Sequence, residues 1–132
     1  METKTYNIKD LRYEHRLWKS EIKIIIGELN VYQEWLSCIS QKSHELEFQK
    51  KIDYFQNKLD IQKKYFDTFN DRVNAQDSIL ESLEKEELNI PETTTNRHEK
   101  LHTDILEAKQ ILADLKIEFH QFCKADFLAT TA

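Results

Sequence analysis

The feature that most constrains the fold is a row of ten residues near the N-terminus, spaced alternately three and four positions apart. Nine of the ten are apolar and the other is a histidine. Steps of three and four keep side chains on one face of an α-helix, so the row predicts a helix that buries one stripe against partner helices. The row consists of Ile8, Leu11, His15, Trp18, Ile22, Ile25, Leu29, Tyr32, Leu36 and Ile39.

Two more rows with this spacing follow, so three long helices account for most of the chain. Its 132 residues include one glycine and one proline, and such a chain lacks the turn residues that a β-sheet needs at every hairpin. We therefore predict an all-α protein with a single domain, residues 1–132. The second row is Phe48, Ile52, Phe55, Leu59, Gln62, Phe66, Phe69, Val73, Gln76, Leu80 and Leu83, and the third is His98, Leu101, Ile105, Ala108, Leu112, Leu115, Phe119 and Phe122.

The connections between the helices are predicted from a change of phase and from one proline. The first row does not continue in phase into the second, which indicates a turn between them. Pro91 and three threonines follow the second row, and proline lacks the amide donor that a helix interior needs. Because short connections favour antiparallel neighbours, the predicted architecture is an up-down-up three-helix bundle of long coiled-coil-like helices. The expected segments are helix 7–40, turn 41–43, helix 44–88, loop 89–95 and helix 96–128.

Polar residues at these boundaries are expected to cap the helices. Asn7 is expected to accept a hydrogen bond from the backbone N–H of Asp10. Ser43 is the predicted cap of the second helix. Asn96 and Glu99 have the spacing of a capping box at the start of the third helix.

Three polar residues, His15, Gln62 and Gln76, occupy row positions where an apolar side chain would pack at lower cost. Buried polar residues in coiled coils exclude slipped alignments, so we predict that these three control the register of the helices. The predicted helix ends place His15 near Phe69 and Lys116. The row itself brings no acid or nucleophile to His15, so we predict no catalytic residue and no enzymatic activity.

Histidines near the start of the third helix are the candidate metal ligands. His98 and His102 lie one helical turn apart, and Glu99 or Glu87 are candidates to complete a three-ligand site. Glu99 and His102 also form a Glu-x-x-His motif, but a di-iron bundle needs two such motifs and the chain has one. We therefore predict neither a metal nor another cofactor, and keep a metal-binding bundle, hemerythrin-like or zinc-binding, as the alternative function.

The charge of the chain argues against two classes of partner. Its 19 basic and 24 acidic residues give a net charge of -5, which disfavours nucleic acid and anionic membranes. The longest apolar run, 24–26, is far too short to span a bilayer, and no signal sequence is recognisable, so we expect a cytoplasmic protein. Cys38 and Cys123 are expected to be free thiols in a reducing compartment.

One segment carries a family resemblance. Residues 13–18 read Tyr-Glu-His-Arg-Leu-Trp, with a Glu-His-x-x-Trp pattern, and Phe55, Gln56 and Asn57 follow in the second row. Together with a third helix that starts at a histidine, these residues resemble a family of small uncharacterised bacterial all-helical proteins. The resemblance implies the helical fold and no activity.

The aromatic residues beside the rows indicate the class of function. Tyr13, Trp35, Tyr54 and Tyr65 widen the apolar surface beyond a narrow seam. Whatever part of that surface a third helix leaves uncovered needs a partner. The sequence therefore predicts a non-enzymatic module for protein–protein interaction or self-assembly, whose partner is another protein or a second copy of the chain.

Overall fold

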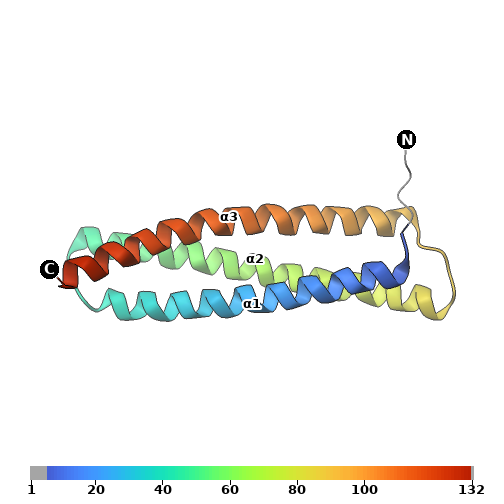
Figure 1. The fold of residues 1–132 in the computed structure, drawn as a ribbon, viewed down its shortest axis with the longest axis horizontal. Coiled ribbons are helices and arrows are strands. Elements are labelled where there is room, and N and C mark those ends of the chain that lie inside the picture. The colour runs from blue at the N-terminus through green and yellow to red at the C-terminus, as the bar shows by residue number, and fades with distance from the viewer. Residues whose placement is uncertain (1–5, 132) are drawn as a thin grey trace.

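A computed structural model describes the backbone of residues 6–131 and the side chains of residues 6–126. It contains three long helices, α1 (Ile8–Ser40), α2 (Leu46–Lys85) and α3 (Glu92–Thr131), and residues 6–131 include no β-strand. The helices α1 and α3 run in one direction and α2 runs back between them (Figure 1). The predicted all-α, up-down-up bundle is confirmed.

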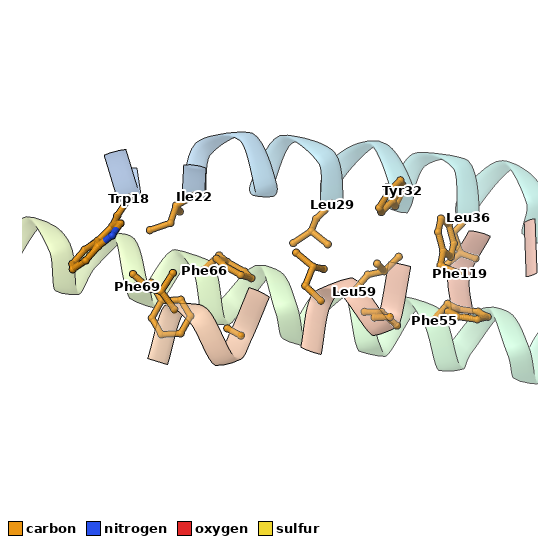
Figure 2. Close-up of a cluster of buried hydrophobic side chains, with 14 of the residues drawn as sticks. Trp18, Ile22, Leu29, Tyr32, Leu36, Phe55, Leu59, Phe66, Phe69 and Phe119 are labelled. Atoms are coloured by element: carbon orange, nitrogen blue, oxygen red, sulfur yellow. The ribbon is translucent and has the colours of Figure 1, made fainter. Parts of the chain in front are cut away.

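The three rows form the core of this bundle. Side chains of α1, α2 and α3 point toward one another along its axis (Figure 2). Leu36, Leu59, Phe66 and Phe119 are all 0% exposed, so residues from each helix are fully removed from water. Burial of apolar surface along the whole length of the rods holds them together, and the row spacing places it on one face of each helix.

The turn between α1 and α2 lies where the change of phase predicts it, but it is longer. It spans residues 41–45, and α2 therefore begins at Leu46 instead of residue 44. Ser43 is not the N-cap of α2: its Oγ accepts from the backbone N–H of Glu45, at 3.1 Å, and Glu45 holds the cap position. Gln49 donates its amide to the carbonyls of Ser40 and Ser43, which ties the two helix ends together.

Asn7 caps α1 as predicted, but through a nearer amide. Its side-chain oxygen accepts from the backbone N–H of Lys9, at 2.8 Å, and not from that of Asp10. The cap satisfies one of the amide donors that a helix N-terminus leaves without an intrahelical partner.

The helix α2 ends at Lys85, three residues before the predicted end at residue 88, in a Schellman-type turn. Glu87 adopts the left-handed backbone conformation, with a φ of 54°. The backbone N–H of Leu88 bonds to the carbonyl of Leu83, and that of Glu87 bonds to Glu84. Glycine usually occupies the left-handed position of this motif. Because the residue here is a glutamate, the sequence does not predict the turn.

The helix α3 begins at Glu92, so the predicted loop 89–95 is wrong for residues 92–95. The carbonyl of Pro91 accepts from the backbone N–H groups of Thr94 and Thr95, which makes the proline the start of the helix. A proline is tolerated there because the first amide groups have no intrahelical acceptor. The predicted capping box of Asn96 and Glu99 is also wrong, since both lie inside α3. The helix continues to residue 131, past the predicted end at 128.

The longer first turn and the earlier start of α3 both change the alignment of the helices. His15 does not lie beside Phe69 and Lys116 as predicted: its ring contacts Asp77 of α2 and His98 of α3. The predicted positions assumed a shorter first turn and a third helix that begins several residues later. Because the bundle is a set of parallel and antiparallel rods, each of these differences moves contacts along the axis.

The core predicts a large difference between two adjacent aromatic residues of α2. Phe66→Ala removes a side chain with no exposure and should lower the free energy of unfolding by about 3–5 kcal/mol. Tyr65→Ala, at a position that is 51% exposed, should cost less than about 1 kcal/mol. Urea unfolding followed by circular dichroism measures both, and equal losses would contradict this packing.

The left-handed turn predicts a stabilising substitution. Glu87→Gly should raise the free energy of unfolding by about 1 kcal/mol, because glycine adopts a positive φ without steric cost. Glu86→Gly makes the same charge change at a neighbouring residue with a φ of −90° and should give no gain. Thermal unfolding of the two variants makes the comparison.

Candidate functional site

A chain of polar side chains crosses the bundle near the end where α1 and α3 begin. His15 of α1 and His98 of α3 are 1% and 3% exposed, and His98 Nδ1 lies 3.2 Å from His15 Nε2. The outer nitrogen of each ring meets a carboxylate: His15 Nδ1 is 3.0 Å from Asp77 Oδ1, and His98 Nε2 is 2.9 Å from Glu14 Oε2. We call these four residues the histidine chain.

Each helix contributes to the histidine chain from a defined position. His15 and His98 lie on the apolar rows of α1 and α3, so the rows bury them together. Asp77 lies on the flank of α2, and Arg12, one turn before His15, donates Nε and Nη2 to its two oxygens, each at 3.3 Å. Arg12 Nη1 also lies 3.7 Å from Glu84 Oε2. The histidine chain therefore joins all three helices.

Aromatic side chains cover one side of the histidine chain. Trp18 stacks on the ring of His98, with centroids 4.7 Å apart, and on His102, at 5.5 Å. Tyr6 approaches His98 edge-on at 6.4 Å. These rings exclude water, which strengthens the hydrogen bonds inside and raises the cost of any unpaired charge.

The number of protons in the histidine chain follows from its contacts. Ionised carboxylates only accept, so the outer nitrogens of His15 and His98 must both donate. Two neutral rings then have no proton left for the contact between His98 Nδ1 and His15 Nε2. With both rings neutral, the two outer contacts to the carboxylates are hydrogen bonds, and the contact between the inner nitrogens brings two acceptors together.

The pKa shifts of His15 and Asp77 favour a neutral imidazole beside an ionised carboxylate. Burial, the largest effect, together with the facing His98 lowers the pKa of His15, although Asp77 acts in the opposite direction. Burial alone would raise the pKa of Asp77, but hydrogen bonds from His15 and Arg12 outweigh it, and the net pKa lies below the ordinary aspartate value. Asp77 is therefore an anionic acceptor at neutral pH.

An acid does lie beside His15, although the row itself supplies none, as expected. Asp77 supplies one, from the flank of the second row and not from the row itself. A carboxylate that orients an imidazole is an arrangement found in general-base catalysis. Here, however, both nitrogens of both rings are engaged within the protein and both rings are buried, so neither can reach a substrate atom without a rearrangement.

The structure separates the roles of the candidate metal ligands. His98 is held in the histidine chain, while the ring of His102 stacks on Trp18. Glu87 forms the exposed left-handed turn after α2, and Glu99 is half-buried on α3. Over the described part of the chain, no group of three or more His, Cys, Asp or Glu side chains is arranged to hold a metal ion. The metal-binding alternative stays a prediction.

The two glutamines of the second row differ in burial. Gln62 is 5% exposed and Gln76 is half-buried, and the side-chain oxygen of each is buried without a hydrogen-bond partner. Gln76 donates to the carbonyl of Arg97 at 3.5 Å. Buried unsatisfied oxygens cost stability, which fits a role in excluding other alignments. That role in register stays a prediction.

A second feature lies on the side of α1 that is turned away from the core. Leu17, Ile24 and Val31 are spaced seven residues apart and are 46%, 67% and 41% exposed. Tyr13 and Trp35 extend the same face, and we call these five residues the outer face of α1. Intervals of four and seven residues place these five side chains on one side of the helix, with Ser20 and Gly27 between them.

Gly27 lies on α1, and a Cβ added there would meet no atom within 4 Å, so no close contact within the described part of the chain requires a glycine at this position. Cys38 is exposed and Cys123 is partly buried, and both are free thiols as predicted.

Comparisons with known proteins add no constraint to these observations. No family model matches the chain, and neither a curated protein nor a solved structure matches it. The resemblance to small bacterial helical proteins therefore stays a prediction. Over residues 6–131, no helix is both long and apolar enough to cross a membrane.

The lowered pKa of His15 predicts a loss of stability in mild acid. Below about pH 6.5 the unfolded chain binds a proton at His15 that the native state resists, so the free energy of unfolding falls as the pH drops. The contribution is fully present above that value, and its slope cannot exceed about 1.4 kcal/mol per pH unit. Urea unfolding between pH 5 and pH 8 measures it.

A substitution of Asp77 tests whether this carboxylate acts on the pKa of His15. Asp77→Asn removes the effects that raise the pKa of His15, so that pKa should fall further in an NMR titration of the His15 ring. Asp71→Asn makes the same change at an exposed position on α2 and should leave the titration unaltered. An unchanged His15 pKa in Asp77→Asn would contradict the hydrogen bond.

Proposed function

We propose that this protein is a non-enzymatic helical module that binds another protein, or a second copy of itself, through the outer face of α1. The observation that carries the proposal is the apolar stripe of Leu17, Ile24 and Val31 on the side of α1 opposite the core. Single exposed apolar residues are common on soluble proteins, whereas a continuous row marks an interaction surface.

The geometry of the stripe indicates the kind of contact. A straight helix with apolar residues at seven-residue intervals packs against another helix with the same repeat. Tyr13 and Trp35 lie near the two ends of the stripe and are 60% and 49% exposed, and exposed aromatic residues often contribute most of the energy of an interface. The partner surface is therefore expected to be an amphipathic helix.

The remaining exposed apolar residues form shorter stripes. On α2, Tyr54, Ile61 and Tyr65 are 42%, 36% and 51% exposed, and intervals of seven and four residues place them on one face. On α3, Leu106 and Ile117 lie eleven residues apart and share a face, while Ile111 lies on another. The outer face of α1 is longer, with five exposed apolar residues between residues 13 and 35.

A matched pair of isoleucines tests the proposal. Ile24→Lys should abolish association, because it places a charge in the centre of the stripe. Ile117→Lys on α3, where the isoleucine is 60% exposed compared with 67% for Ile24, should leave association intact. Sedimentation velocity over a wide concentration range detects self-association, and affinity purification from the native cell detects a protein partner.

The proposal requires an associated species that depends on Ile24 in at least one of these measurements. A chain that stays monomeric at every concentration and retains no protein in an Ile24-dependent manner would overturn it. Circular dichroism shows that each variant is folded, since both positions are exposed and neither belongs to the core.

A further inference from the structure

The two inner nitrogens of the histidine chain face each other across a buried contact. His98 Nδ1 and His15 Nε2 lie 3.2 Å apart, and when both rings are neutral each of these nitrogens presents a lone pair. Both rings are almost fully buried, so bulk water does not screen the repulsion between the lone pairs. Two buried acceptors that converge in this way favour a cation between them.

The carboxylates at the two ends of the histidine chain direct these lone pairs inward. Glu14 accepts from His98 Nε2 at 2.9 Å, and Asp77 accepts from His15 Nδ1 at 3.0 Å. A histidine that binds a metal ion almost always donates its other ring N–H to a carboxylate, a carbonyl or water, which fixes the tautomer and makes the ligand more basic. Both rings therefore have the outer contact that is typical of a metal-binding imidazole.

The separation of the inner nitrogens is close to that of two ligands on one ion. Zinc binds imidazole nitrogen at about 2.0–2.1 Å in a tetrahedral arrangement, which places two ligand nitrogens about 3.3–3.4 Å apart. The observed distance is 3.2 Å. The ring centroids are 5.1 Å apart and the ring planes are tilted by 43°, so the two rings do not lie along one line. Both nitrogens can therefore bind one ion with little movement of either ring.

The charges around the two rings compensate a divalent ion. Burial of a cation is costly unless charges of opposite sign lie close to it. Asp77 and Glu14 place two carboxylates at the ends of the histidine chain. Arg12 bonds to Asp77 but also lies 3.7 Å from Glu84, so this further pair adds no net charge. The two carboxylates of the histidine chain are thus left to balance two positive charges.

The protonation state and the exposure of the histidine chain also suit a metal ion. An imidazole binds a metal only in its neutral form, and burial, the largest effect, lowers the pKa of His15 and so favours that form. The side chains of Asp77 and Glu14 are 29% and 42% exposed. The carboxylates past which an ion would enter are therefore in contact with water.

We propose that His15 Nε2 and His98 Nδ1 together bind a divalent transition-metal ion, and that zinc fits their geometry. Over the described residues no third His, Cys, Asp or Glu side chain completes the site, so water would occupy the remaining positions on the ion. The ion would link α1 to α3 at the end of the bundle where both helices begin. This site goes beyond the proposed function and shares no residue with the outer face of α1.

Titration of the full chain with zinc chloride tests the site. After treatment with a chelator, the protein should bind one zinc ion per chain in isothermal titration calorimetry. Zinc at about a hundredfold excess over its dissociation constant should raise the melting temperature by roughly 5 °C, because a ligand that binds only the native state stabilises it. A chain that binds no zinc, or whose melting temperature does not respond to it, overturns the proposal.

Two histidine variants identify the ligands. His15→Asn should abolish zinc binding, whereas His102→Asn should leave it unchanged. His102 lies one helical turn after His98, so these two histidines would form the competing site on α3 alone. Zinc binding that survives His15→Asn, or that His102→Asn abolishes, overturns the proposal.

NMR of the ring nitrogens in the wild-type chain decides the matter even if a variant does not fold. Zinc should shift the signals of Nε2 of His15 and Nδ1 of His98, while the outer nitrogen of each ring keeps its proton and its carboxylate partner. Zinc bound through the outer nitrogen of either ring would contradict the proposed ligands.

A substitution of Glu14 tests whether the carboxylates support the site. Glu14→Gln should weaken zinc binding about tenfold or more, because the outer partners of metal-binding histidines contribute about 10–100-fold to the affinity. Glu34→Gln makes the same charge change at an exposed position on α1 and should alter the dissociation constant less than about twofold. Equal effects of the two substitutions would count against the site. None of these measurements involves Ile24, so the proposed function stands if the metal site fails.

Discussion

The axial alignment of the three helices is the constraint on which the rest of the structure depends. Burial of the three apolar rows fixes it, because Leu36, Leu59, Phe66 and Phe119 lose all exposure only when the rods are packed side by side in this register. A shift of one helix by a turn would leave apolar groups facing solvent at one end and would change which polar side chains meet. The polar contacts are consequences of that alignment.

The histidine chain adds a geometric condition to this apolar packing. His15 contacts Asp77 of α2 and His98 of α3, so the contacts of this one residue depend on the positions of both other helices. Apolar contacts tolerate small sliding, whereas hydrogen bonds near 3 Å in a water-excluded site do not. The histidine chain therefore favours the native register at the end of the bundle where α1 and α3 begin, although burying its polar groups costs free energy.

The two faces of α1 have different consequences. Its inner face supplies the first row of the core, and its outer face carries a second apolar repeat that the bundle leaves exposed. Charged residues border that repeat on both sides, and on one side lysines of α3 hold the carboxylates in position. The surface available to a partner thus depends on the fold, although its residues all come from one helix.

Particular residues show which features of the structure the sequence predicts and which it does not. The rows identify the core because their spacing is local, and the phase change before Phe48 locates the first turn. Residues 92–95 are helical although the prediction placed them in the loop with Pro91, since a proline either ends a helix or precedes one and only its surroundings decide. Glu87 carries no signal for its left-handed conformation. Asp77 lies off the row, so no periodicity links it to His15.

The sequence by itself determined that the chain forms three amphipathic helices, which residues they bury, and that His15 would be enclosed. Those properties follow from spacing along single helices. Only the tertiary structure decided that His15 meets Asp77 and His98, because their contact depends on how three separate rods align. The packing along the whole length of the three helices sets that alignment. No short stretch of sequence is enough to predict it.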